Sequence, residues 1–326
     1  MLPWLPDRSK LLLSSSQPGT PLSWGPGIAV ANRAGWPDIR AFAFLAVLAY
    51  VCTKIGVDLM LIPLFTPRPD RPMRVAGFLS GSGTNLVKIL ERQSELERSP
   101  EGSPFRVVVL FTDTPASNAQ AIGAAHGIPV LTLDILAFYR QRGRPDKKDL
   151  SLRPDFDRRV LDALAPYRVD AVVLAGYMSV VTAPLLNAFA GRIVNVHPAD
   201  LRILDKGRRK YTGDHAVRDA ILSGETVLRS STHIVRHEVD YGEILMVSRG
   251  LPVLLPEGMT ARELALPQNR QILKRVAAEH QNRLKEAGDW VILPKTLEWM
   301  ARGRYSLDEN HRVFLDGRLL ENPEIP

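Results

Sequence analysis

Three polar residues, Asn195, His197 and Asp240, are the clearest sign of chemistry in this chain. An apolar, β-branched stretch precedes Asn195 and predicts a buried strand that ends in a turn at Pro198. Because side chains alternate along a strand, Asn195 and His197 are expected to project from the same face. An amide donor and an imidazole at a strand end suit acyl-type chemistry. Asp240, if folded against them, would set the charge state of the histidine. These residue types predict an enzyme.

A second candidate site is a glycine-rich turn at residues 80–85, between a predicted strand at 74–79 and a helix that opens at Leu86. Glycines let the backbone approach a ligand closely, and a helix N-terminus offers free N–H groups to an anion. The turn lacks the third glycine of the dinucleotide fingerprint and the Gly-Lys-Ser/Thr of a P-loop. It therefore predicts a phosphate site of another kind, or a tight turn without a ligand.

Strands and helices alternate along the chain at the spacing of a sheet with right-handed crossovers. Strands are predicted at 74–79, 105–111, 130–133, 170–175 and 192–197, with helices at 116–126, 155–165 and 178–189. The expected fold class is α/β, a doubly wound and mostly parallel sheet with helices on both faces. Both candidate sites follow carboxyl ends of strands, the edge where such sheets bind ligands, so the two are expected to meet.

The composition is that of a globular protein of 326 residues, with 45% apolar and 24% charged residues. The net charge of +7 suits an anionic small molecule, a nucleic acid or a membrane surface, and does not choose among them. Cys52 is the single cysteine, so no internal disulfide can form, and no Cys/His cluster has zinc spacing. We expect a cytoplasmic protein without a metal.

Residues 1–72 are predicted to be an N-terminal extension, followed by one catalytic domain at 73–326. The first 38 residues, rich in Pro, Ser and Gly, predict disorder. The apolar run at 41–52 is shorter than the roughly 20 residues of a membrane span. A short apolar helix, or a segment absent from the natural product, is favoured over membrane contact of residues 41–65. Residues 66–72 are expected to form a linker.

Ordered motifs from about Met73 to Leu320 resemble those of the folate-dependent formyltransferase family. They are the phosphate loop at 80–86, the strand and turn beside the folate pocket at 172–178, the catalytic strand at 191–198, the strand and loop of the catalytic aspartate at 232–242, and the end of a C-terminal helix with a β-hairpin at 299–318. The order and spacing of these pieces together carry the resemblance.

The resemblance implies transfer of a formyl group from 10-formyltetrahydrofolate to the primary amine of a phosphorylated substrate. Glycinamide ribonucleotide, from purine biosynthesis, is the expected acceptor, and no metal is required. Asn195 and His197 would stabilise the tetrahedral oxyanion, while Asp240 would hold His197 and help to move protons. By the same resemblance, the acceptor phosphate is expected on Gly81, Ser82, Gly83, Thr84, Asn85 and Arg192, the acceptor amine on Asp289, and the folate on Tyr177, Met178, Ser179 and Val180.

The chain departs from the family pattern at positions that leave the acceptor open. A strongly basic insertion at 202–210 could bind a phosphate, a folate tail or RNA, or be a solvated loop. Ser179 stands where the glycinamide enzymes commonly carry a basic residue, and Tyr241 and Glu243 replace the usual Gly and Pro. A nucleotide sugar amine, an aminoacyl-tRNA or a non-catalytic folate- or nucleotide-binding role are the alternatives.

The partners expected from this reading are small molecules, with no nucleic acid. Methionyl-tRNA formyltransferases carry a further C-terminal domain, whereas this chain stops soon after the hairpin at 315–318. A monomer and a homodimer are both compatible with the sequence.

Removal of residues 1–59 is expected to leave a soluble, active enzyme, because the predicted core and every candidate site residue lie beyond them. Formyl-transfer activity and the thermal unfolding of the shortened chain, compared with the full chain, test this. Loss of folding would show that the apolar run belongs to the core.

Overall fold

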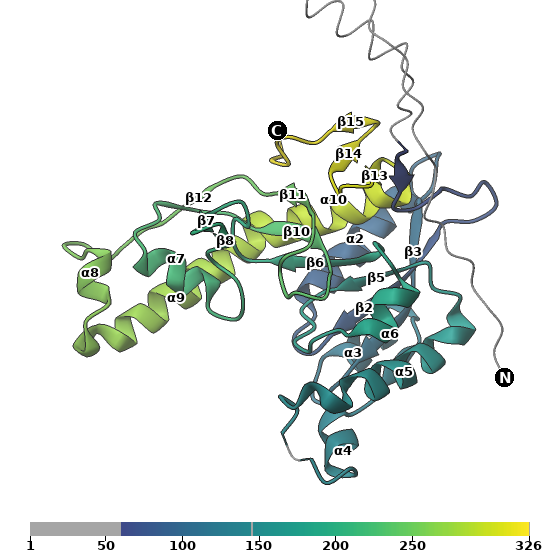
Figure 1. Ribbon diagram of the computed structural model, residues 1–326, viewed down its shortest axis with the longest axis horizontal. Helices are drawn as coiled ribbons and strands as arrows, with labels where there is room; N and C mark the ends of the chain where they lie inside the picture. The colour runs from purple at the N-terminus through teal and green to yellow at the C-terminus, as the bar shows by residue number, and fades with distance from the viewer. Residues whose placement is uncertain (1–59, 145, 326) are drawn as a thin grey trace, which may run out of the picture. The chain divides into compact units, whose positions relative to one another are not determined.

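A seven-stranded sheet carries the candidate residues, with the strand order β11-β10-β6-β5-β2-β3-β4 (Figure 1). The computed structural model describes residues 60–144 and 146–325. Strands β4, β3, β2, β5 and β6 are parallel, whereas β10 is antiparallel to both of its neighbours. The strands are β2 (Met73–Leu79), β3 (Phe105–Thr112), β4 (Val130–Thr132), β5 (Ala171–Leu174), β6 (Ile193–His197), β10 (Ser231–Ile234) and β11 (Ile244–Val247).

Helices cover both faces of this sheet, and each face has its own apolar core (Figure 1). The first core joins the sheet to α2 (Thr84–Glu97), α3 (Ala119–His126) and α10 (Trp290–Ala301). The second core joins it to α4 (Ile135–Arg140), α5 (Arg153–Leu164) and α6 (Ala183–Ala188). The doubly wound, mostly parallel α/β architecture predicted from the sequence is therefore confirmed.

A third core lies outside the sheet and packs α7 (Ala216–Leu222), α8 (Ala261–Leu264) and α9 (Arg270–Leu284) together. The remaining elements are short: β1 (Ile62–Pro63), β7 (Leu204–Asp205), β8 (Arg208–Arg209), β9 (Val227–Leu228), β12 (Leu251–Pro252), β13 (Tyr305–Leu307), β14 (Val313–Leu315), β15 (Arg318–Leu319), and the helical turns η1 (Leu150–Leu152), η2 (Ala165–Tyr167), η3 (Pro267–Asn269) and η4 (Lys285–Asp289). Strands β13, β14 and β15 form the expected C-terminal hairpin region after α10.

Two helices differ from their predicted bounds. The helix predicted at 178–189 begins only at Ala183, with Pro184 in its first turn, the place where a helix tolerates proline. Residues 178–182 are thereby left as a loop beside the site. The sequence also predicts a helix over about 267–287; in the structure this helix, α9, begins at Arg270 and passes through the π turn η4 into α10. Such turns occur mostly as single insertions within α-helices, frequently at functional sites.

The domain begins before the predicted boundary at Met73. Strand β1 pairs with β13, and Leu64 and Phe65 are buried in the first core. Arg71 donates to the carboxylate of Asp170 at 3.0 Å, so residues 66–72 are not a free linker. The predictions made for residues 1–59, disorder and an apolar segment, lie outside the described residues. Within the described part of the chain, no helix is both long and apolar enough to cross a membrane.

Gly242 has no room for a side chain. A Cβ added there would lie 1.7 Å from the carbonyl oxygen of Ile234. We expect Gly242→Ala to lower the free energy of unfolding by about 1–3 kcal/mol, measured by urea denaturation. Gly81→Ala is the control for stability, because a Cβ at Gly81 meets nothing within 4 Å. Equal unfolding midpoints for the two variants would contradict this close packing.

Candidate active site

Two adjacent strands and one loop bring four polar side chains together. Strand β6 carries Asn195 and His197, and β10 pairs His233 directly with Asn195. The loop after β10 returns Asp240 to the same place. One of its carboxylate oxygens, Oδ2, lies 3.4 Å from Nδ1 of His197, and the other, Oδ1, lies 3.4 Å from Nε2 of His233. The predicted approach of Asp240 to His197 is thus seen in the structure.

Asp240 is held as an anion. Its backbone is left-handed, with φ of 59°, and the backbone N–H of Gly213 donates to its Oδ2 at 3.0 Å. Burial opposes ionisation, but the hydrogen bond from His233, the charge of His197 and the Gly213 N–H outweigh it, and the pKa of Asp240 falls to about 2. The carboxylate is therefore ionised at neutral pH.

His197 is buried between two acceptors. Its Nδ1 faces Asp240, and its Nε2 lies 3.0 Å from the backbone oxygen of Tyr211. Burial lowers the pKa of His197, although the carboxylate of Asp240 acts in the opposite direction. The neutral ring is therefore favoured more than in water. A substrate oxygen could receive the Nε2 proton only by replacing the Tyr211 carbonyl.

His233 is a site residue that the sequence analysis missed. It is 1% exposed, and its Nε2 lies 3.4 Å from the amide nitrogen of Asn195. Its Nδ1 lies 2.9 Å from the oxygen of Ile234, which fixes the ring within the strand. The available signal was a histidine inside a short buried strand, Ser231–Ile234, shortly before Asp240. Only the antiparallel register shows that it faces Asn195.

These residues border a cavity of about 670 Å³ at the carboxyl ends of β2, β5 and β6. All but one of the predicted site residues line it: Gly81, Ser82, Gly83, Thr84, Asn85, Tyr177, Met178, Ser179, Val180, Asn195, His197, Asp240 and Asp289. His233 and Lys285 line it as well. The two motifs expected at one edge of the sheet do meet there.

Arg192 is the predicted site residue that the structure does not bring to the cavity. It precedes β6, at the amino end of the strand, and its guanidinium donates to the backbone oxygen of Ala188 at 3.1 Å. It lines a separate small cavity together with Arg68 and Asp170. The catalytic edge lies at the opposite end of β6, so its assignment to the acceptor phosphate is corrected.

Asp113, at the end of β3, links the glycine-rich turn to the loop at 177–180. It is 2% exposed, and it accepts hydrogen bonds from Ser80 Oγ at 2.7 Å and from Ser179 Oγ. Ser80 Oγ in turn accepts from the backbone N–H of Met178 at 3.0 Å. The hydroxyl of Ser179 therefore points to Asp113. Position 179 thus offers a ligand no basic side chain.

Asp289 lies in the π turn η4 and is buried at the wall of the cavity. Ser230 Oγ donates to it at 2.6 Å, and the side-chain amide of Asn85 lies 3.4 Å away. Burial raises the pKa of Asp289 to about 6 despite these hydrogen bonds. The carboxylate is thus connected to the last residue of the glycine-rich turn. No group of three or more His, Cys, Asp or Glu side chains among residues 60–144 and 146–325 is arranged to hold a metal ion.

Comparison with known proteins identifies the family of this chain. The model of the formyl transferase family matches residues 73–265. The phosphoribosylglycinamide formyltransferase of Haemophilus influenzae is 29% identical over 247 residues, which are 76% of this chain and 95% of that enzyme. A trifunctional purine biosynthetic protein, adenosine-3 of Drosophila melanogaster, is 30% identical over 185 residues, which are 57% of this chain and only 12% of that protein.

Among solved structures, glycinamide ribonucleotide transformylase 1 from Symbiobacterium toebii is similar, with 31% sequence identity and a TM-score of 0.53. The match covers 75% of this chain and 94% of that one.

Asp289→Asn is expected to change how stability depends on pH. The folded-state pKa of about 6 lies above the ordinary value of 3.8, so ionising Asp289 costs stability as the pH rises from about 4 through 6. The variant lacks this loss. Its free energy of unfolding relative to the parent should therefore rise by up to about 3 kcal/mol between pH 4 and pH 7. Urea denaturation at both pH values measures it, and a constant difference would contradict the burial argument.

Proposed function

Because the chain belongs to the formyl transferase family, we propose that it moves a formyl group from 10-formyltetrahydrofolate to the primary amine of glycinamide ribonucleotide. The observation that supports this most is the approach of Asp240 to His197, beside Asn195, at a cavity bordered by the glycine-rich turn. These groups match the needs of the reaction. The nucleophile is the acceptor amine, so the protein needs no nucleophilic Ser or Cys.

The reaction needs donors where negative charge develops. Attack of the amine on the formyl carbon forms a C–N bond and leaves the formyl oxygen as an oxyanion. The side-chain amide of Asn195 and the ring of His197 are proposed to donate to that oxygen. The bond from the formyl carbon to the folate nitrogen then breaks. The proton lost by the amine passes to that nitrogen, and His197 is proposed to carry it.

Asp240 is proposed to support His197 during that transfer. An ionised carboxylate beside the ring stabilises the imidazolium whenever His197 holds the extra proton. Its pKa of about 2 keeps it charged throughout the neutral range. Because burial lowers the pKa of His197, the ring also gives the proton up readily. His197 and Asp240 together are therefore suited to accept a proton from the amine and to donate it to the folate nitrogen.

The acceptor phosphate is proposed to bind at the glycine-rich turn. Residues 81–85 lead into α2, and its N-cap Gly83 is left-handed with no side-chain cap. The first N–H groups of a helix without such a cap are suited to an anion. Asp289, next to Asn85, is ionised above about pH 6 and is proposed to accept a hydrogen bond from the neutral acceptor amine before reaction.

The folate is proposed to lie along the loop at 177–180. This loop is one wall of the cavity, and Val235 and Val239 add further apolar surface. Asp113 holds the loop to the glycine-rich turn through Ser80 and Ser179. Both proposed substrates would thereby rest on one rigid support.

Glycinamide ribonucleotide is preferred over the other amines for two reasons. The relatives named for this substrate match over nearly their whole length, 95% in the case of the Haemophilus influenzae enzyme. The arginines of the basic insertion, the feature that left RNA binding open, are paired within the protein. A cytoplasmic location and a monomeric or homodimeric state stay predictions.

His197→Ala and Asp240→Asn are each expected to lose most formyl-transfer activity without unfolding. Removal of one oxyanion donor costs about 100–1,000-fold in rate, so His197→Ala should fall at least that far. The assay follows transfer from 10-formyltetrahydrofolate to a panel of amines, with formate release in the absence of an amine as a separate measurement. The control is His237→Ala, an exposed histidine of the same loop, which should keep the parent rate.

Three outcomes would overturn parts of this proposal. Near-normal turnover by His197→Ala would contradict the assigned roles. Transfer to another amine but not to glycinamide ribonucleotide would contradict the acceptor. Binding of the folate without turnover on any amine would favour the non-catalytic alternative.

A further inference from the structure

The basic insertion at 202–210 is bound to the rest of the chain at both of its ends. It contains the hairpin of β7 and β8. Four of its five cationic side chains have acidic or carbonyl partners: Arg202, Arg208, Arg209 and Lys210. A surface intended for a polyanion would leave its cations free. The insertion is therefore built to contact the protein itself.

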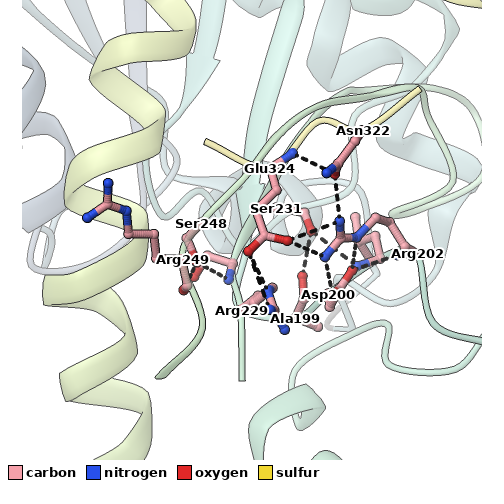
Figure 2. Close-up of polar contacts among 11 residues, drawn as sticks. Ala199, Asp200, Arg202, Arg229, Ser231, Ser248, Arg249, Asn322 and Glu324 are labelled. Carbon is pink, nitrogen blue, oxygen red and sulfur yellow. Dashed lines mark hydrogen bonds and ion pairs between the residues drawn. The ribbon is translucent and has the colours of Figure 1, made fainter. Parts of the chain in front are cut away.

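The first end of the insertion is anchored by the C-terminal tail, as Figure 2 shows. Arg202 donates to Asp200 at 2.7 and 2.8 Å and to the side-chain oxygen of Asn322 at 3.1 Å. Glu324 lies 3.4 Å from both Arg202 and Arg229. This tail, residues 322–325, lies alongside β11. The N–H of Ile325 donates to the backbone oxygen of Val247 at 3.0 Å, and the N–H of Val247 donates to the backbone oxygen of Pro323 at 2.8 Å.

The second end of the insertion reaches the loop of the catalytic aspartate. The Nη1 of Arg209 donates to the backbone oxygen of Asp240, and its Nη2 donates to that of Gly242 at 2.9 Å. The backbone N–H of Arg209 donates to the hydroxyl of Tyr241 at 3.1 Å. The guanidinium groups of Arg208 and Arg209 lie 5.2 and 5.6 Å from the centre of the Tyr241 ring.

We propose that Arg209 is a positioning residue that holds Asp240 in its left-handed backbone conformation, with one carboxylate oxygen on His197 and the other on His233. This assignment rests on the proposed function only for its effect on the rate. The left-handed region is disfavoured for residues other than glycine, so surrounding contacts commonly hold such a residue in place. The planar fork of Arg209 supplies them, since it binds the carbonyls on both sides of Tyr241.

The proposal joins two of the departures from the family pattern. The insertion supplies Arg209, and the loop of Asp240 carries Tyr241, at a position where the resemblance predicts glycine. The hydroxyl of Tyr241 receives the N–H of Arg209, and its ring lies beneath two guanidinium groups. The two departures are therefore halves of one contact.

Arg209→Lys tests the proposal with the charge at this position unchanged. An ammonium group cannot replace the fork, so the Asp240 carboxylate should lose its alignment. The expected result is a fall in kcat of about 10- to 100-fold, with the KM for each substrate changed less than about twofold. The matched control is Arg208→Lys in the same hairpin, because Arg208 contacts the same ring but is paired with Glu238 and exposed. It should keep the parent kcat.

NMR titration of the imidazole rings separates a positioning role from a merely structural one. His197 is faced by Asp240, His233 and Arg209, and of these only Asp240 raises its pKa. In Arg209→Lys the cation is retained, so displacement of Asp240 should lower the pKa of His197 below that of the parent. Arg208→Lys should leave it unchanged.

The NMR titration needs no substrate. It therefore tests the role of Arg209 even if the parent enzyme fails to formylate glycinamide ribonucleotide. A folded Arg209→Lys variant with parental kcat and an unchanged His197 titration would overturn the proposal. So would equal losses in the two lysine variants. An Arg209→Lys variant that unfolds, while Arg208→Lys does not, would show a structural role instead and also overturn it.

Discussion

The site depends on one carboxylate placed between two imidazoles. Asp240 lies 3.4 Å from both His197 and His233, and its oxygens are divided between them. Such a cluster is stable only if the buried charge is compensated on every side. The N–H of Gly213 adds a donor to the carboxylate, and the guanidinium of Arg209 holds the backbone oxygen of the same residue. The insertion, the tail that anchors it and the close packing at Gly242 all converge on this one residue.

Two further buried carboxylates connect the chain segments around the rest of the cavity. Asp113 joins the glycine-rich turn to the loop at 177–180, and Asp289 joins the turn to the π turn η4. Each connects chain segments that are far apart in sequence. Residues at strand ends and loops thus gain fixed positions from a few charged or polar links, while the two apolar cores fix the sheet behind them.

Local pattern in the sequence predicted the parallel strands and the glycine-rich turn, and the family resemblance predicted the approach of Asp240 to His197. It could not supply what depends on tertiary placement. The antiparallel register that brings His233 to Asn195 is invisible in one strand alone. Arg192 was assigned to the phosphate by resemblance but lies at the amino end of β6, away from the cavity. The π turn, the inward hydroxyl of Ser179 and the pairing of the insertion's cations likewise arise from contacts between distant segments.

The most direct measurement is a crystal structure of the enzyme with a stable tetrahedral analogue that joins the folate to glycinamide ribonucleotide. The account predicts the analogue's oxygen at about 2.7–3.1 Å from the amide nitrogen of Asn195 and from a ring nitrogen of His197. The phosphate should lie on the glycine-rich turn. An analogue bound with its tetrahedral centre away from both donors, or with its phosphate elsewhere, would contradict the account.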